Sequence, residues 1–305
     1  MAVAPRPHFR WALHTRSLVL GERTLLVGVV NVTPDSFSDG GNFLSATNAI
    51  DHGLRLLDEG ADLLDLGAES TRPGSNAGGA APAVSADQEQ ARLLPVVEGI
   101  LHARPDAILS VDTYKAATAR AALAAGAEIV NDVSGFAWDP ALAAVCAELD
   151  AGVVLSHTRG WPEEWSAQPQ LEPDELMKIV RYGLAASLSQ AEAAGIALQA
   201  VLLDPGYGFG KRFGENYALL ARQRELLSLG RPLLAGVSRK SFLGHTLAPL
   251  FGSSPAPVTA RESASLAAMT ASILNGASVV RVHRVRPALE AARIADAVLN
   301  TLETR

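Results

Sequence analysis

The sequence predicts a single-domain α/β protein, a (β/α)8 TIM barrel with long mobile loops after the first and second strands. Three observations support this fold class. Short aliphatic runs recur along the chain, alanine- and leucine-rich helical stretches separate them, and polar residues gather at the carboxyl end of each run. Apolar strands that alternate with helices predict a parallel sheet covered on its outer face. Eight such units favour a closed barrel over an open doubly wound sheet.

The predicted strands are short runs rich in β-branched and aliphatic residues. In chain order they cover 24–31, 61–69, 107–113, 128–135, 152–158, 200–206, 232–240 and 279–285. The predicted helices cover 45–60, 87–103, 115–126, 139–150, 173–195, 215–228, 259–276 and 287–304. The barrel proper then spans about 24–304 after a short N-terminal extension, 1–23, and the whole chain, 1–305, forms one domain. Two inserts, 76–84 and 245–258, follow predicted strands.

Composition excludes several classes of partner. The net charge of −6 comes from 26 basic and 32 acidic residues without a basic run, so we expect no nucleic acid partner. No stretch reaches the roughly 20 apolar residues of a membrane span, and the N-terminus lacks the apolar segment of a signal peptide, so we expect a cytoplasmic protein without a membrane partner. The single cysteine, Cys146, excludes an internal disulfide framework and fits a core position.

Polar residues end every predicted strand. These residues are Asn31, Glu69, Asp112, Asn131, His157, Asp204, Lys240 and His283. In a barrel the carboxyl ends of all strands converge on one mouth, where the active sites of this fold lie. Each residue taken singly could instead cap the following helix, but the recurrence at eight strands favours a functional site.

Four of these residues suit a flat heterocycle. Asp112, Asn131, Asp204 and Lys240 offer two carboxylates, an amide and an ammonium group. A carboxylate accepts paired hydrogen bonds from an amidine-like edge, while the amide and the ammonium group serve ring nitrogens and a carbonyl. The alternative is a structural ion-pair network that closes the barrel.

A second group is cationic and predicts a phosphate or diphosphate site. Strand alternation places Arg281 and His283 on the same side of the last strand, facing the barrel interior. The segment ESTRPGS adds Thr71 and Arg72, and arginine is the preferred residue for phosphate recognition. The alternative for Arg281 and His283 is a satisfied ion pair.

The segment DPGYGFGK, 204–211, is glycine-rich but matches neither a Walker A loop nor a dinucleotide fingerprint. We interpret its glycines as allowing the backbone to approach a ligand, with Phe209 as a wall of the site.

Taken together, the motifs resemble one known family. NVTPDSFSDGG, ESTRPGS, SVDTYK, NDVSG, DPGYGFGK, SRKSFLG and RVH are similar, in this order, to the signature segments of dihydropteroate synthases. The resemblance implies a TIM barrel, a homodimer and a role in folate biosynthesis. It also implies that 6-hydroxymethyl-7,8-dihydropterin diphosphate and 4-aminobenzoate are the small-molecule substrates, that 7,8-dihydropteroate and pyrophosphate are the products, and that Mg²⁺ is the cofactor.

The resemblance also implies roles for individual residues. The residues that it implies for pterin binding are Asp112, Asn131, Asp204, Lys240 and Phe209. Diphosphate binding falls to Asn31, Thr71, Arg281 and His283, with Asn31 also as the metal ligand. The 4-aminobenzoate residues are Phe37, Arg72, Pro73 and Ser241, and the catalytic residues are Asp112, Lys240 and Asp35. Cleavage of the bond to diphosphate before amine attack would leave a cationic methylene, which Asp112 and Asp35 stabilise.

Four positions depart from the family pattern. Arg284 follows His283 where the family usually has an acid, and we expect it beyond the strand end and dispensable for substrate binding. Ser156 and Thr158 flank His157 in place of methionines, and Ala68 replaces a glycine.

Two alternatives remain open. One is a pterin-binding methyltransferase domain that serves a corrinoid partner, which would have no reason to keep both SRKS and RVH. The other is a catalytically silent paralogue that binds pterin or a partner protein.

Overall fold

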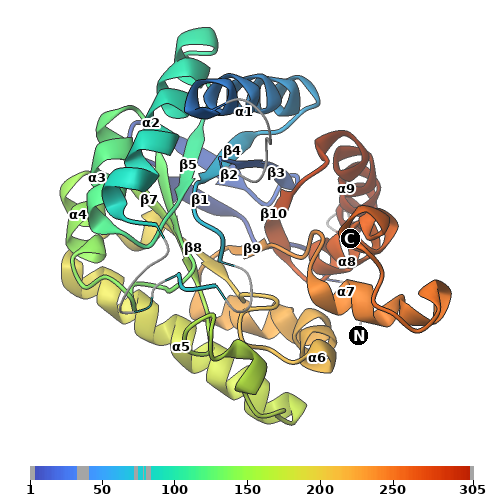
Figure 1. Ribbon diagram of the computed structural model, residues 1–305. Coiled ribbons are helices and arrows are strands. Elements are labelled where there is room, and N and C mark those ends of the chain that lie inside the picture. Colours follow the sequence, from blue (N-terminus) through green and yellow to red (C-terminus); the bar gives the residue numbers. More distant parts are fainter. Residues whose placement is uncertain (1–3, 33–40, 72–74, 78, 80–83, 303–305) are drawn as a thin grey trace.

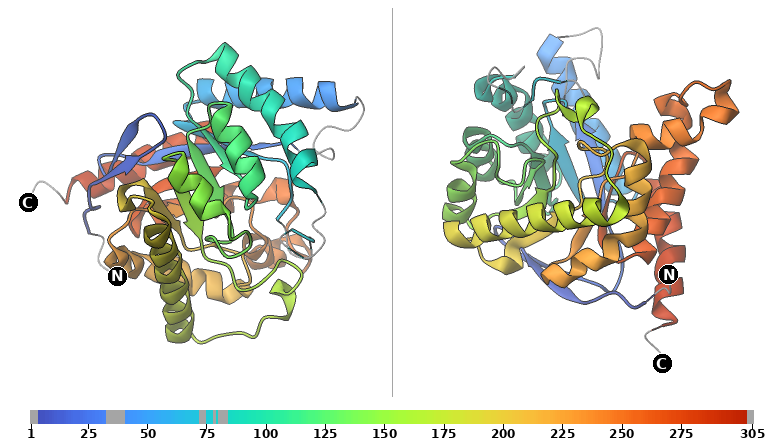
Figure 2. Two further views of the ribbon diagram at one scale, coloured as in Figure 1. Left: turned by 90° about the vertical axis from the view of Figure 1, so that its left-hand side faces the viewer. Right: turned by 90° about the horizontal axis from the view of Figure 1, so that it is seen from below.

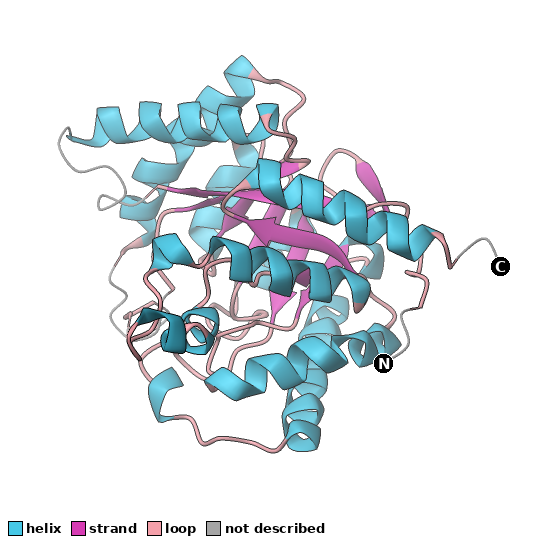
Figure 3. Cartoon of the chain, turned by 90° about the vertical axis from the view of Figure 1, so that its right-hand side faces the viewer, coloured by secondary structure: helices cyan, strands magenta, loops and turns pink. Residues whose placement is uncertain are grey.

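The computed structural model describes residues 4–302 except 33–40, 72–74, 78 and 80–83. Eight parallel strands close into a barrel, and helices surround it (Figures 1 and 3). The strands are β3 (Leu25–Asn31), β4 (Leu63–Gly67), β5 (Leu109–Asp112), β6 (Ile129–Asp132), β7 (Gly152–Ser156), β8 (Val201–Asp204), β9 (Leu233–Ala235) and β10 (Ala277–Val282). They pair in chain order, and β10 closes on β3. The predicted fold class is confirmed, while most of the two loops expected to be mobile lies outside the described residues.

The helices follow the strands as predicted. They are α1 (Gly41–Asp58), α2 (Ala86–Ala103), α3 (Ala116–Ala124), α4 (Leu142–Glu148), α5 (Pro173–Ala194), α6 (Phe213–Arg222), α7 (Ser241–Thr246), α8 (Glu262–Leu274) and α9 (Val285–Asn300). Local signals explain several bounds: Ser85 and Gln88 form a capping box at the start of α2, and α5 begins at Pro173 and ends at Gly195 in a left-handed conformation. Sequence analysis missed α7, which is only six residues long.

Apolar side chains pack on both sides of the barrel wall. The larger cluster lies between the strands and the surrounding helices, and it includes the fully buried Cys146. A smaller cluster fills the barrel interior near the amino ends of the strands. Because the interior is filled there, the open part of the barrel is the opposite, carboxyl end.

A hairpin of β1 (Phe9–Ala12) and β2 (Ser17–Leu20) closes the amino end of the barrel (Figure 2). Trp11 is fully buried in the interior cluster, and its indole Nε1 donates a hydrogen bond to the Ala200 carbonyl oxygen over 2.9 Å. Arg6 pairs with Asp296 of α9 at 2.6 Å, which ties the chain before the hairpin to the last helix. Sequence analysis read this segment only as an extension.

Strand alternation sends the polar residues of the carboxyl half into the barrel. Leu63 and Val279 belong to the interior cluster, so Asp65 and Arg281, two residues further along the same strands, face the same side. In the described part of the chain, we find no helix with the length and apolarity needed to cross a membrane.

Candidate active site

Arg281 is the centre of the ion-pair network at the barrel mouth. From β10 its Nε donates to Asp65 Oδ2 at 2.5 Å, and its Nη2 donates to Asp112 Oδ2 at 2.8 Å. Asp65 lies in β4 and Asp112 ends β5, so three strands meet in this network. Asp65 is 1% exposed, whereas Asp112 and Arg281 remain about one-fifth exposed at 20% and 22%. A ligand in the mouth can therefore reach Asp112 and Arg281.

Asp65 also holds the amide predicted to bind a heterocycle. The Nδ2 of Asn131, in β6, donates to Asp65 Oδ2 over 3.0 Å. Asp65 thus orients both Arg281 and Asn131 from behind. Sequence analysis missed this residue, although a carboxylate with inward alternation inside the apolar run LLDLG was a usable signal.

Asp204 and Lys240 lie on the neighbouring part of the mouth. Asp204 ends β8 and accepts a hydrogen bond from the Gly206 backbone N–H over 2.7 Å. The Lys240 ammonium lies over the Phe209 ring, 3.7 Å from its centroid. The structure therefore brings together the predicted heterocycle residues, with Phe209 as a wall beside Lys240.

Burial and neighbouring charges shift the pKa values of two of these groups toward neutral pH. Burial raises the pKa of Asp112 to about 7; Arg281 opposes the rise, and Asp65 adds to it. Burial lowers the pKa of Lys240 to about 8, against the attraction of Asp204. Burial also raises the pKa of Asp204, although the Gly206 N–H opposes it. Perturbed groups of opposite charge gathered in one concave site are typical of an active centre.

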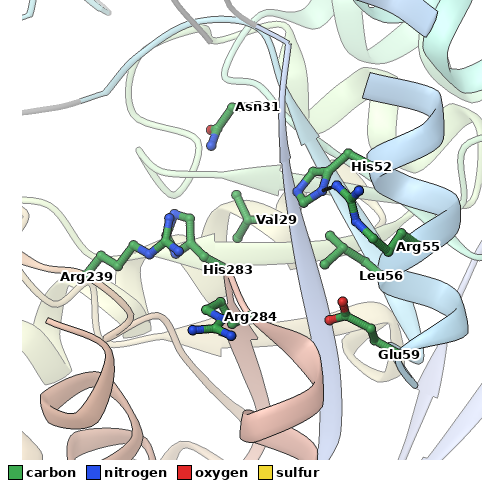
Figure 4. Close-up of a pocket in the computed structure, with 9 residues that line it drawn as sticks. All are labelled: Val29, Asn31, His52, Arg55, Leu56, Glu59, Arg239, His283 and Arg284. Atoms are coloured by element: carbon green, nitrogen blue, oxygen red, sulfur yellow. Dashed lines mark hydrogen bonds between the residues drawn. The ribbon is translucent and has the colours of Figure 1, made fainter. Parts of the chain in front are cut away.

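Two of the four predicted diphosphate residues line a pocket beside this network, whereas Arg281 and Thr71 do not. His283 and Asn31 both border it, and Arg284 and Arg239 lie next to them (Figure 4). His283 Nδ1 lies 2.9 Å from the Ser238 hydroxyl, which orients the ring. Arg284 is exposed and lies beyond the end of β10, as expected, but it shares this pocket with His283.

The structure describes two of the remaining predicted residues, Thr71 and Ser241. Thr71 is half-buried after β4, and Ser241 is the first residue of α7, directly after Lys240. Asp35, Phe37, Arg72 and Pro73 lie outside the described residues.

Two residues expected at the mouth point elsewhere. His157 faces α5, because a Cβ on Gly183 would lie 2.4 Å from its Cδ2. Burial lowers its pKa well below the usual value, so this ring is a neutral core group. Glu69 pairs with the buried Lys115 rather than with the central network. Both side chains therefore contact neighbouring elements. His157 packs against α5, and Glu69 pairs with Lys115, the residue before α3.

The glycine-rich segment has a structural role beyond the one expected. Gly206 adopts φ +72°, and a Cβ there would lie 1.9 Å from the His157 carbonyl oxygen. A Cβ on Gly208 would lie 3.2 Å from Lys240 Cδ. These glycines therefore bring the loop against the end of β7 and the side chain of Lys240, whereas we expected them to bring the backbone against a ligand.

The donor set for a metal is small. Among the described residues, no group of three or more histidine, cysteine, aspartate or glutamate side chains could hold an ion. Asn31 ends β3 with an exposed side chain beside His283. A single amide oxygen suits Mg²⁺ bound mainly through substrate phosphates and water, which is the usual mode for that ion.

Comparisons with known proteins agree with this geometry. The pterin binding enzyme family matches residues 27–283. The dihydropteroate synthase of Mycobacterium leprae is 42% identical over 279 residues, covering 90% of this chain and 93% of that relative. The folate synthesis bifunctional protein of Pisum sativum is 39% identical over 289 residues, but this chain spans only 54% of its length.

Solved structures resemble the whole chain. The dihydropteroate synthase of Xanthomonas albilineans with 4-aminobenzoic acid has a TM-score of 0.83 and 40% identity, covering 96% of this chain and 98% of that one. The same enzyme in complex with 7,8-dihydropteroate has a TM-score of 0.80 and 38% identity, covering 95% and 98%. Both the fold and the sequence are therefore shared over nearly the full length.

Proposed function

Because this chain belongs to the pterin-binding enzyme family and to its dihydropteroate synthases, we infer that it condenses 6-hydroxymethyl-7,8-dihydropterin diphosphate with 4-aminobenzoate. The products are 7,8-dihydropteroate and pyrophosphate, and the enzyme is a transferase of folate biosynthesis. The convergence of Asp112, Asn131, Asp204 and Lys240 at one barrel mouth carries this inference, because a flat amino-amide heterocycle needs such a donor and acceptor set.

These four residues form the proposed pterin site. Asp112 and Asp204 accept hydrogen bonds from the amino and ring N–H groups, while Asn131 and Lys240 serve ring nitrogens and the carbonyl. Asp65 fixes Asn131 at 3.0 Å, so the amide is oriented before the ligand arrives. Phe209 covers the ring from the side of Lys240.

Asn31, Thr71, Arg281 and His283 form the proposed diphosphate site. Arg281 and His283 share the inward side of β10 and its continuation, which supports a common ligand. Mg²⁺ fits this site through Asn31 together with diphosphate oxygens. When bound, the ion would neutralise the charge that the leaving diphosphate develops.

Asp112, Lys240 and Asp35 are the proposed catalytic residues. Ionised Asp112 faces the carbon that becomes cationic when its bond to diphosphate breaks, and it stabilises that charge in a site shielded from water. Lys240 holds the pterin ring while the neutral amine of 4-aminobenzoate attacks. Asp35 is assigned by its place in the motif NVTPDSFSDGG.

Ser241, Phe37, Arg72 and Pro73 are the proposed 4-aminobenzoate residues. Ser241 follows Lys240 at the start of α7, so a ligand there would lie beside the pterin site. We also propose a homodimer, which sedimentation of the purified protein would test.

Turnover by the purified protein tests the function. We expect 7,8-dihydropteroate, detected by mass spectrometry, when the diphosphate substrate, 4-aminobenzoate and Mg²⁺ are present together. Omitting 4-aminobenzoate should abolish product. Binding of the pterin substrate without product would favour a silent paralogue, and transfer of a methyl group to a corrinoid protein would favour the methyltransferase alternative.

A further inference from the structure

A notch opens in the barrel wall where β10 ends before its neighbour. The pairing of β10 with β3 stops at Val282 and Gly28, whereas β3 continues to Asn31. The freed edge of Val29–Asn31 borders a pocket with a volume of about 330 Å³. Figure 4 shows this pocket with α1 on one side of β3 and the residues after β10 on the other. The notch therefore connects the proposed diphosphate site with the outer face of the barrel.

The walls of the notch are cationic. Arg55 lies in α1, Arg239 lies in the turn after β9, and Arg284 is the residue directly before α9. Among the described residues that line the notch, Glu59 is the one carboxylate. Three arginines from three separate elements thus lie beside one lining carboxylate, Glu59, and a second one, Glu262, 3.9 Å from Arg239 Nη2, so arginines outnumber carboxylates among these described residues.

His52 lies beside Arg55 in the same pocket. Its Nδ1 lies 2.9 Å from Arg55 Nη2. Burial is the main cause that lowers the pKa of His52, and Arg55 lowers it further; the Val29 backbone and Glu59 oppose this change, and Arg239 adds the smallest lowering effect. Two arginines and one carboxylate of the pocket wall thus act on His52.

The backbone of Arg239 is held in an unfavourable conformation that carries its side chain into the notch. Its φ is 59°, a region that non-glycine residues rarely adopt. Two hydrogen bonds fix it: the Arg239 N–H donates to Ser265 Oγ over 2.9 Å, and its carbonyl oxygen accepts from Arg261 Nη1 over 3.1 Å. Its buried Nε has no partner among the described residues, and Glu262 is 3.9 Å from its Nη2. Backbone strain of this kind is typical of ligand-binding positions.

Arg281, in the inner diphosphate site, already has two carboxylate partners. Arg281 already donates to Asp65 and Asp112, so two carboxylates offset its charge in the unliganded protein. A substrate tethered by its pterin ring can compete for Arg281. A free anion at Arg281 must compete with these two carboxylates without that tether.

We propose that the notch is a second anion site, formed by Arg284, Arg239 and Arg55, that binds inorganic pyrophosphate as it leaves the inner diphosphate site. This proposal rests on the proposed function and extends it. The shared chemistry is a diphosphate group, which could belong to the substrate or to the free product. Only the free product, which no pterin ring holds at the inner site, moves outward.

Calorimetric titration with inorganic pyrophosphate tests the site. In Arg284→Ala we expect the dissociation constant to rise at least about fivefold, because a charge-assisted contact is lost. Arg284→Asp should raise it further. Arg286→Ala is the matched control: Arg286 lies two residues after Arg284, in the first turn of α9, is exposed, and its side chain pairs with Glu290 at 2.8 Å, with neither residue lining the notch. It should change the constant by less than about twofold.

Kinetics separate the two sources of the diphosphate group. In Arg284→Ala, the inhibition constant of pyrophosphate should rise while the KM of the diphosphate substrate stays within about twofold, a difference under ~0.4 kcal/mol. A parallel rise of both constants would place Arg284 in the substrate site and overturn the proposal, as would an unchanged pyrophosphate affinity. If the wild-type protein gave no turnover, the proposed function would fail, while calorimetry would still decide whether the notch binds pyrophosphate.

Discussion

At the residue scale, the same burial acts in opposite directions on an acid and a base at the barrel mouth. It raises the pKa of Asp112 to about 7 and lowers that of Lys240 to about 8. The catalytic forms proposed here are the ionised carboxylate and the protonated ammonium group. These forms coexist between the two pKa values, so activity depends on a narrow range of pH.

We predict a bell-shaped pH profile of kcat/KM for the diphosphate substrate in the free enzyme. Below about pH 7 the rate falls because Asp112 takes up a proton, and above about pH 8 it falls because Lys240 loses one. Lys240→Arg should move the alkaline limb upward, since a guanidinium stays protonated. A profile that stays flat between pH 6 and 9 would contradict these roles.

Single residues also mark the limit of sequence reasoning. Asp112, Asn131, Asp204 and Arg281 were predicted because each ends a strand or fits a motif. Asp65 was missed because it lies inside an apolar run, where its contacts with Arg281 and Asn131 come from other strands. The pairing of carboxylates with cations depends on which strands the closed barrel brings together, and the local sequence pattern does not determine that pairing.

At the element scale, α5 packs against the end of β7 through one glycine. Gly183 leaves room for the His157 ring, and its added Cβ would come within 2.4 Å of that ring. The spacing between helix and strand is therefore set by the absence of a side chain. Ser156 and Thr158 stand on either side of His157, at the positions where the family pattern has methionines. His157 itself is buried and packs against α5.

We predict that Gly183→Ala destabilises the protein by about 1–3 kcal/mol, because the methyl group overpacks a buried contact. Gly214→Ala in α6 is the matched control, since an added Cβ there meets nothing within 4 Å. That change should be neutral or stabilising by up to about 1 kcal/mol. Urea unfolding of both variants measures the difference. Equal stability of the two would show that α5 can move away from β7.

Elements within a long aliphatic run or a long helical pattern were predictable from sequence, whereas α7 and the N-terminal hairpin were not. The eight barrel strands follow from aliphatic runs and polar ends. Helix α7 has six residues, less than two turns, and each hairpin strand has four, so their patterns repeat too few times to be recognised. Tertiary contacts, such as Trp11 with Ala200, hold these pieces in place.

At the scale of the whole molecule, the amino end of the barrel contributes mainly packing, and the carboxyl end contains the functional groups. The amino end is filled by the hairpin and the interior cluster, and the carboxyl end carries the charged network. In this fold the amino end generally serves stability and the carboxyl end chemistry. Mutations at the two ends should therefore affect different measurements.

We predict that Trp11→Ala lowers the free energy of unfolding by about 3–5 kcal/mol, since a fully buried aromatic side chain is lost. Its kcat at a temperature where it stays folded should be unchanged. Val19→Ala in the same hairpin is the control: Val19 is 61% exposed, so the change should stay within about 0.5 kcal/mol. A large loss of kcat in folded Trp11→Ala would show that the two ends are coupled.

The central claim is that the charged network at the carboxyl end performs the condensation, with Asp112 as the group that stabilises the developing cation. The most direct test is the kcat of Asp112→Asn, measured by pyrophosphate release with both substrates saturating and with folding checked by circular dichroism. The substitution keeps the size of the side chain and removes its charge. We predict a loss of at least about 100-fold, the scale for one preorganised electrostatic group. Near-normal turnover by the folded variant would contradict the account.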